Sequence, residues 1–471
     1  MLYPSLAKNI IYGDLNQVKL SIEHQGENIH ELDEYGYTPL IEACIFNKIE
    51  MVEFFLAQGV DVNYPSITGH TALHWAVENN NIEIVKVLLK HDANPNAYSR
   101  ASQPLLILPL LRQQTHLKNL LFEHGADLYF AQDYIATKLL AHRYELVGHV
   151  DIADSKGKYI ELDLEGFFLE FTINVIQHSL GRFKNHFSAK HLTQYFGYLQ
   201  HIINAFSSAN ELIKYQHFSI KTEQYDNRIN QLLNTPLQLI PLGYEGHAIC
   251  FVRYKNILVK CDRGAESKKY GSVVIYRMQK PHNFNTAYIK QLMYTKQSKK
   301  NIVDLLPQYL DLVPITQLPI PAQVTGNCSW ANLEAAVPTL LFLLLMDQYQ
   351  TSNNDQILDC KEQALTIYQD WYAWDQQTAL HEYIVETHKA QGQRKICRVM
   401  LLANFIFQKL NYQRIEDLYI AEKILPILMQ PDTQYVLAAY KAIFYDKYRT
   451  EKGSNLVNLI ELCGYSFKYH E

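Results

Sequence analysis

The amino-terminal part of the chain repeats with a period of 33 residues, and this feature constrains the fold more than any other. The run DEYGYTPLIEACIFNKIEMVEFFLAQGVDVN at 33–63 aligns with SITGHTALHWAVENNNIEIVKVLLKHDANPN at 66–96. Four pairs keep the spacing: Gly36 and Gly69, Thr38 and Thr71, Ala43 and Ala76, and Asn63 and Asn96. A unit of this length cannot bury its apolar face alone. The sequence therefore predicts a stack of helix pairs in this region, not one globular core.

These units resemble the ankyrin repeat in the G-x-T-P-L start, the helix-turn-helix and the G-A-D-x-N loop. Thr38 and Thr71 are expected to cap the first helix of each unit, because a threonine hydroxyl accepts from free backbone amides. The resemblance implies a solenoid of about four repeats over residues 1–145. It also implies that loop tips bind other proteins and carry no chemistry. The candidate protein-binding residues are Asn63, Asn96, Tyr64 and Tyr98.

Asn63 and Asn96 leave two interpretations open. Ankyrin loops resemble substrates of asparaginyl hydroxylases, which would make a host hydroxylase a partner of this chain. Alternatively, both asparagines only hydrogen-bond the loop backbone.

Length and composition limit the remaining classes. A chain of 471 residues is too long for one hydrophobic core. With a net charge of −5 and no basic run, it is not expected to bind nucleic acid. The start of the chain lacks the pattern of a conventional signal peptide. The most apolar run, VPTLLFLLLM at 337–346, is shorter than the roughly 20 residues of a membrane span, so a buried core helix is predicted.

The seven cysteines are scattered and form no C-x-x-C pair. Neither a disulfide framework nor a zinc site is indicated, and reduced thiols in a cytosol-like compartment fit this pattern. We expect no metal and no cofactor.

The periodicity changes after residue 146 and predicts an α+β domain over 146–336. Alternating runs predict strands near 146–167, and a β-hairpin is predicted over 241–264 with the turn Lys255–Asn256. From 337 to 471 the spacing is helical. The predicted fold class is multidomain α and α+β: an ankyrin solenoid (1–145), an α+β domain (146–336) and a carboxy-terminal helical domain (337–471).

The stretch AQVTGNCSWANLEAAV at 322–337 places Cys328 at the start of an apolar helix. A helix amino terminus stabilises a thiolate, so Cys328 is a candidate nucleophile. In the predicted hairpin, His247 begins one strand and Asp262 lies within diagonal reach on the same face. Asp262 could then orient the imidazole as it deprotonates the thiol. The Cys328 amide and the Gln323 side chain are candidates for the oxyanion site.

Structural interpretations stay open for these residues: His247 could be a hydrogen-bonded structural residue at the start of a strand, and Asp262 a solvated turn residue. Free cysteines are often buried apolar side chains, and this is expected of Cys250 and Cys261. Trp330 and Asn332 are expected to pack and cap the helix that begins at Cys328.

The chain order His247, Asp262, Gln323, Cys328 resembles the clan of adenovirus, SUMO and ubiquitin-like cysteine proteases. The resemblance covers about residues 146–336 and implies a papain-like or cysteine-protease-like α+β domain that acts as a thiol hydrolase. The arrangement of an ankyrin stack, a protease-like domain and helices resembles the ankyrin-repeat effectors of Legionella.

That second resemblance implies a virulence protein of type IV secretion, delivered into the host cytoplasm or nucleus without a conventional signal peptide. Its substrate would be a host protein, with a ubiquitin-like conjugate as one class. Two alternatives stay open: a non-catalytic ankyrin adaptor that binds a host nuclear or cytosolic protein, and an acyltransferase on the same Cys-His-Asp site.

Overall fold

The computed structural model describes residues 5–34, 36–216, 222–265, 267–324, 326–349 and 353–467. The chain divides into two compact units. The first, here called the ankyrin unit, comprises Met1–Thr137, Gly148–Leu164 and Ile384–Glu471. The second, here called the sheet unit, comprises Lys138–Val147 and Glu165–Tyr383. The three-part division at 145 and 336 stays a prediction about domains.

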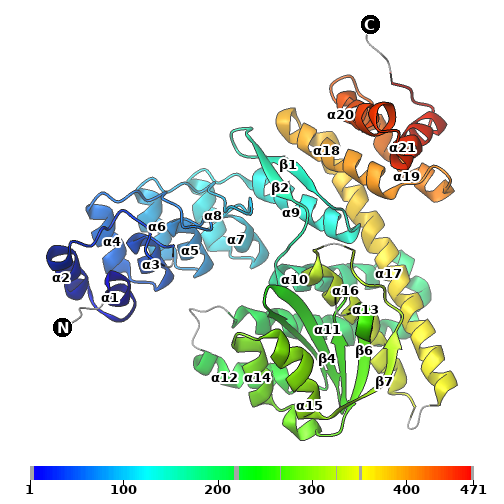
Figure 1. Ribbon diagram of the computed structural model, residues 1–471, viewed down its shortest axis with the longest axis horizontal. Helices are drawn as coiled ribbons and strands as arrows, with labels where there is room; N and C mark the ends of the chain where they lie inside the picture. Colours follow the sequence, from blue (N-terminus) through cyan, green and yellow to red (C-terminus); the bar gives the residue numbers. More distant parts are fainter. Residues whose placement is uncertain are drawn as a thin grey trace. The chain divides into compact units, whose positions relative to one another are not determined.

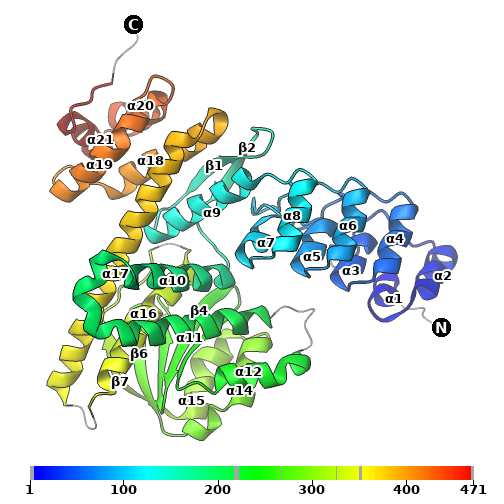
Figure 2. The same cartoon turned by 180° about the vertical axis from the view of Figure 1, so that it is seen from behind.

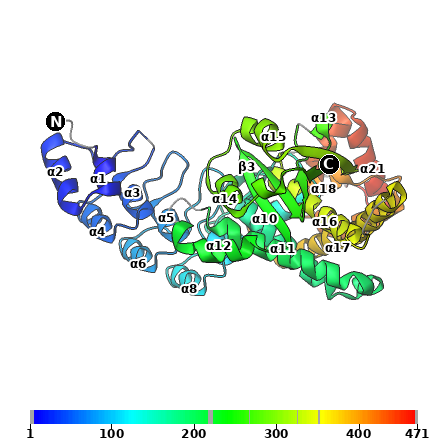
Figure 3. The same cartoon turned by 90° about the horizontal axis from the view of Figure 1, so that it is seen from below.

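The ankyrin unit begins with helix pairs, as the repeat predicts (Figure 1). The pairs are α1 (Leu6–Tyr12) and α2 (Leu15–Gln25), α3 (Pro39–Ile45) and α4 (Ile49–Ala57), α5 (Ala72–Glu78) and α6 (Ile82–Lys90), and α7 (Ile107–Leu111) and α8 (Thr115–Glu123). Figure 3 shows α4, α6 and α8 in one row, with α3 and α5 in the row beside it. Thr38 caps α3, because its hydroxyl accepts from the Ile41 N–H at 3.2 Å. Thr71 caps α5, and its own N–H donates to His74 Nδ1 at 3.0 Å.

The rest of this unit is a hairpin and a group of helices. Its elements are β1 (His149–Ala153), β2 (Tyr159–Asp163), α18 (Gly392–Lys409), α19 (Ile415–Leu428), α20 (Gln434–Lys441), the π-helical η5 (Ala442–Lys447) and α21 (Glu451–Leu462). Strand β1 pairs antiparallel with β2 and contacts α18 (Figure 1). Two long helices, α9 (Leu128–Arg143) and α17 (Asn354–Lys389), contribute residues to both units.

A buried ion cluster in the ankyrin unit joins α9 to α18. The Asp133 carboxylate is 3% exposed and accepts from Arg394 Nε at 2.5 Å and from Arg398 at 2.6 Å. Arg398 is also 3% exposed. Buried charges of this kind are tolerated only when each has its partner. The pairing therefore fixes the carboxy-terminal helices against α9.

The sheet unit contains a five-stranded antiparallel meander in the order β3-β4-β5-β6-β7. The strands are β3 (Leu237–Tyr244), β4 (His247–Tyr254), β5 (Ile257–Cys261), β6 (Val273–Met278) and β7 (Leu312–Leu318). Strands β4 and β5 flank the turn Lys255–Asn256, and Tyr254 faces Ile257. The predicted hairpin and its register are confirmed.

Helices cover both faces of this sheet because successive strand residues point to opposite sides. On one face Leu239, Val252 and Val259 share a core with the first group of helices, and on the other Ile240, Phe251 and Leu258 share a core with the second group. Figure 2 shows α10 and α11 lying across the first face. The first group is α10 (Leu169–Lys184), η1 (Phe187–Tyr195), α11 (Phe196–Lys214), α16 (Cys328–Met346) and α17. The second is α12 (Asp226–Leu233), α14 (Thr286–Tyr294), η4 (Asn301–Leu305) and α15 (Leu306–Leu310), and the short helices η2 (Thr222–Tyr225), α13 (Ser267–Tyr270) and η3 (Pro281–Asn283) lie in connections.

Helix α16 contains the apolar run noted in the sequence. By length and composition alone it could cross a membrane, with a mean hydropathy of 1.5, but 89% of that window is buried inside the protein. It contacts β4, β5, α10 and α11. The predicted core helix at 337–346 is therefore confirmed, and it extends back to Cys328.

The Asp133 cluster generates a stability prediction. Replacing Asp133 by Ala leaves the buried Arg398 guanidinium and the partly buried Arg394 guanidinium without their anion, so we expect a loss of about 3 to 5 kcal/mol in the free energy of unfolding. Glu386→Ala is the matched control in the same unit, because the Glu386–Lys389 pair is exposed and should be worth less than about 1 kcal/mol. Denaturant unfolding of both variants measures the difference. Equal losses would contradict the role given to Asp133.

Candidate active site

The candidate site is built on the first turn of α16, where Cys328 is the first helical residue. The Asn327 carbonyl accepts from the Trp330 and Ala331 amides, each at 2.9 Å. The earlier amides of a helix have no partner within the helix. The Ser329 N–H is one of these amides, and its interaction with the Cys328 thiol helps to lower the pKa of that thiol. Cys328 itself is half-buried.

His247 and Asp262 meet across the hairpin as the register predicts. His247 is the first residue of β4, and Asp262 directly follows β5. The imidazole and the carboxylate share a hydrogen bond, with 2.9 Å between His247 Nε2 and Asp262 Oδ1. The same oxygen accepts from the Gly264 N–H at 3.1 Å, and Lys260 Nζ lies 3.6 Å from Oδ2. The Asp262 side chain is 2% exposed, so this carboxylate is fixed in the interior.

Glycine is required at position 264 by a close approach of the imidazole. A Cβ atom on Gly264 would lie 2.6 Å from His247 Cε1 and 2.8 Å from Nε2. Any side chain would therefore push the imidazole away from Asp262.

Cys328 is the second partner of the imidazole, because the interaction between His247 and Cys328 raises the pKa of His247 and lowers that of the thiol. The Ala248 N–H also donates to Cys328 Sγ, at 3.4 Å. The structure thus brings Cys328, His247 and Asp262 into one connected cluster.

The electrostatics of the cluster favour a thiolate beside an imidazolium. The hydrogen bonds to Asp262 and to Cys328 raise the pKa of His247 to about 9, although burial opposes this. Burial raises the pKa of the Cys328 thiol, but hydrogen bonds from His247, Ala248 and Ser329 outweigh it and lower that pKa overall. Burial likewise opposes ionisation of Asp262, yet His247 and Lys260 lower its pKa.

Other cysteines differ from Cys328 in this respect. Burial raises the pKa of each thiol in a set of five: Cys44, Cys250, Cys360, Cys397 and Cys463. Cys250 and Cys261 are fully buried, as expected of apolar side chains. A lowered thiol pKa is the usual property of a nucleophilic cysteine.

Gln323 lies beside the cluster without joining it. Its backbone N–H donates to the Arg263 carbonyl at 2.9 Å. Its Oε1 atom is buried and has no hydrogen-bond partner among the described residues. The side chain forms no hydrogen bond with Cys328, so its proposed role at an oxyanion stays a prediction.

Three contributors to the cluster were not predicted: the Ala248 amide, Lys260 and Gly264. The register itself could have suggested Gly264, because the count from the pair Cys250 and Cys261, extended by three residues, brings position 264 opposite 247. The direction of the Ala248 amide depends on how α16 packs on β4, and no local sequence pattern gives that information.

The predicted protein-binding residues of the repeats fall into two groups. Asn63 and Asn96 bond to the next loop along the stack: Asn63 to Asp92 and Asn94 at 3.1 and 2.8 Å, and Asn96 to Gly125 and Asp127 at 2.8 and 2.6 Å. They therefore join successive repeats. Tyr64 is 41% exposed, whereas the Tyr98 ring packs edge-on against Phe130 at 5.8 Å.

Comparisons with known proteins agree with this architecture. Residues 6–99 match the family described as ankyrin repeats in three copies. Human transient receptor potential cation channel subfamily A member 1 is 41% identical over 73 residues, which is 16% of this chain and 6% of that protein. Ankyrin repeat protein nuc-2 of Neurospora crassa is 27% identical over 118 residues, 25% of this chain and 11% of that protein. The chain thus spans only a small part of these relatives.

A solved structure of the Legionella effector AnkH is similar over the whole length. It is 40% identical, the match covers 99% of each chain, and the TM-score is 0.85. The fold and the cluster define the class as a multidomain ankyrin-repeat protein with an α+β unit. Within that class, the chain belongs to the family of the Legionella effector AnkH.

The site generates a prediction about thiol reactivity. Iodoacetamide should label Cys328 faster than Cys463 at about pH 6.5, because only the Cys328 pKa is lowered, and each unit of pKa changes the thiolate fraction about tenfold. Cys463 is the matched control, since both thiols are half-buried. Peptide mass spectrometry measures the two rates. Equal labelling across the pH range would remove Cys328 as a nucleophile.

Proposed function

We propose that this chain is an effector delivered into a host cell. There the ankyrin repeats bind a host protein, and Cys328 is the nucleophile in the hydrolysis of a bond in a host protein. Delivery is inferred from membership in the family of a Legionella effector. Type IV secretion and residence in the host cytoplasm or nucleus belong to the same proposal. The ankyrin repeats support a protein partner.

The observation that carries the hydrolase proposal is the connection of one sulfur to one imidazole and one buried carboxylate. His247 Nε2 bonds to Asp262 Oδ1 at 2.9 Å, and Cys328 interacts with the same imidazole and raises its pKa. Asp262 fixes the ring orientation and stabilises its positive charge. Acyl transfer by a cysteine requires a nucleophile, a base beside it and a group that orients the base.

The chemistry follows from the charges. The Cys328 thiolate attacks a carbonyl carbon, and a carbon–sulfur bond forms as the carbonyl electrons move onto oxygen. Collapse of this intermediate breaks the bond to the leaving amine, which takes a proton from His247. Water then attacks the thioester while His247 accepts its proton, and expulsion of the sulfur releases the acid and restores the Cys328 thiolate beside the imidazolium. The free amide of Cys328 and the side chain of Gln323 are the proposed oxyanion donors.

An acyltransferase would share the first half of this reaction. In that case an amine or hydroxyl of a second molecule would take the place of water at the thioester. The adaptor alternative needs no chemistry and depends on the ankyrin repeats alone. These alternatives are outcomes of the experiments below.

A trapping experiment tests the hydrolase. Ubiquitin-like proteins with a carboxy-terminal propargylamide should form a covalent adduct with Cys328, because a positioned thiolate adds to the alkyne. The adduct should be absent from Cys328→Ala and strongly reduced in His247→Ala, as seen by mass spectrometry. Acyl transfer to an added amine, without hydrolysis, would favour the acyltransferase. No adduct, together with a Cys328→Ala chain that keeps its effect in host cells, would support the adaptor.

A second experiment separates binding from folding in the repeats. Tyr64→Ala should weaken capture of the host partner and leave the melting temperature unchanged, because Tyr64 is exposed. Asn63→Ala should instead lower stability by about 0.5 to 1.5 kcal/mol for each lost bond. Pull-down and thermal unfolding measure both variants. Unchanged capture by Tyr64→Ala would place recognition on other residues.

A further inference from the structure

The side-chain amide of Asn332 bridges the two chain segments that follow the His–Asp pair. Its Nδ2 group donates to the Ala248 carbonyl at 2.6 Å, and its Oδ1 atom accepts from the Arg263 N–H at 2.6 Å. Ala248 is the residue after His247, and Arg263 is the residue after Asp262. Asn332 is 1% exposed. One buried amide therefore holds the backbone beside both members of the pair.

These bonds lie where the β4–β5 ladder would continue. Cys250 and Cys261 form the last pair in register, and the same count brings Ala248 opposite Arg263. The Asp262 N–H donates to Ser272 at 2.8 Å on the β6 side, so the next amide, that of Arg263, points toward β4. With one donor and one acceptor, the Asn332 amide replaces the direct bond between the two strands.

Asn332 also lies one helical turn after Cys328 on α16. The Ala248 peptide links the two residues: its N–H donates to the Cys328 sulfur and its carbonyl accepts from Asn332. Asn332 was expected to pack or cap this helix. Asn332 lies inside α16 and therefore cannot cap it, because a cap residue precedes the first turn. Its side-chain amide bonds to the two strand ends instead.

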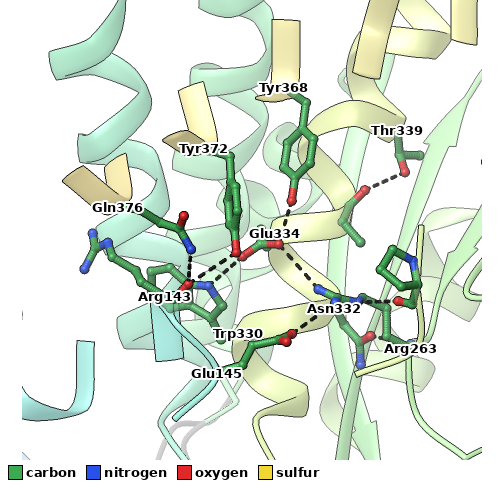
Figure 4. A network of polar contacts seen from close by, with 12 residues as sticks. Arg143, Glu145, Arg263, Trp330, Asn332, Glu334, Thr339, Tyr368, Tyr372 and Gln376 are labelled. Atoms are coloured by element: carbon green, nitrogen blue, oxygen red, sulfur yellow. Dashed lines mark hydrogen bonds and ion pairs between the residues drawn. The ribbon is translucent and has the colours of Figure 1, made fainter. Parts of the chain in front are cut away.

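Figure 4 shows how Arg263 strengthens this attachment. Its guanidinium lies 3.4 Å from Glu334 on α16 and 3.2 Å from Glu145, and it donates to the Pro321 carbonyl at 2.9 Å. Glu334 in turn accepts from Trp330 at 2.8 Å and from Tyr368 at 2.6 Å. The main chain of Arg263 is thus bonded to Asn332 and its side chain is paired with Glu334, two residues further along α16.

We propose that Asn332 is a positioning residue that holds His247 and Asp262 in register with Cys328 by replacing one rung of the β4–β5 ladder. This inference rests on the proposed function, since it assigns the alignment of that same cluster. Loss of one of its two bonds should move His247 relative to the sulfur while the hydrophobic core stays intact.

The test compares the pH dependence of Cys328 alkylation in the full chain and in Asn332→Asp. The carboxylate accepts from the Arg263 N–H but has no hydrogen for the Ala248 carbonyl. We expect alkylation by iodoacetamide to fall about tenfold at pH 6.5 and to recover at high pH, where any thiol ionises. Asn332→Ser, which can fill only part of the bridge, is the second variant and should shift the profile in the same direction.

Thr339→Val is the matched control on the same helix. Thr339 is fully buried and its hydroxyl bonds to the Ala335 carbonyl at 2.7 Å, so its loss should change stability but not the alkylation profile. A folded Asn332→Asp or Asn332→Ser chain with the native profile would overturn the positioning role. Failure of both variants to fold would overturn it as well, by assigning Asn332 to folding. If Cys328 of the native chain is not alkylated faster than an ordinary thiol at pH 6.5, the proposed function fails. If the native chain shows this fast alkylation and the Asn332 variants show it equally, only the positioning role fails.

Discussion

The packing of α16 against β4 and β5 is the constraint on which the candidate site depends. Nearly all of this helix is buried, and its first residue is Cys328. Burial of so many leucines, at about 25 cal/mol per Å² of apolar surface, fixes the helix on the sheet. The hairpin brings His247 to Asp262, and the helix adds the sulfur. Apolar packing therefore sets the geometry of a polar cluster that could not stabilise itself.

The polar groups where α16 meets the sheet have two roles: some set the ionisation of the cluster, and others align its residues. Asp262 keeps His247 protonated, with a pKa of about 9, and the imidazolium lowers the pKa of Cys328. Below about pH 9 and above the lowered thiol pKa, both partners are charged. Asn332 and Arg263 connect the ends of β4 and β5 to α16. A separate region, the ankyrin stack, has exposed loop residues such as Tyr64.

Much of this arrangement can be predicted from the sequence because it depends on local rules. The 33-residue period gives the ankyrin helices, the two-residue turn at Lys255–Asn256 gives the hairpin register, and the glycine before Asn327 and Cys328 marks a helix start. The role of Asn332 could not be predicted, since its partners Ala248 and Arg263 come near it only when helix and sheet pack. Gln323 illustrates another limit: its position along the chain suggests an oxyanion donor, and that role stays a prediction because its Oε1 atom has no hydrogen-bond partner among the described residues.

The central claim is that Cys328 and His247 form a thiolate–imidazolium pair held by Asp262. Thiolate absorbance in the ultraviolet, titrated in the native chain and in Cys328→Ser, isolates the ionisation of this one thiol. The account predicts a difference step with its midpoint well below the usual thiol pKa of about 8.5, and an upward move of that midpoint in His247→Ala. A native midpoint at or above the usual value, unchanged by His247→Ala, would contradict the account.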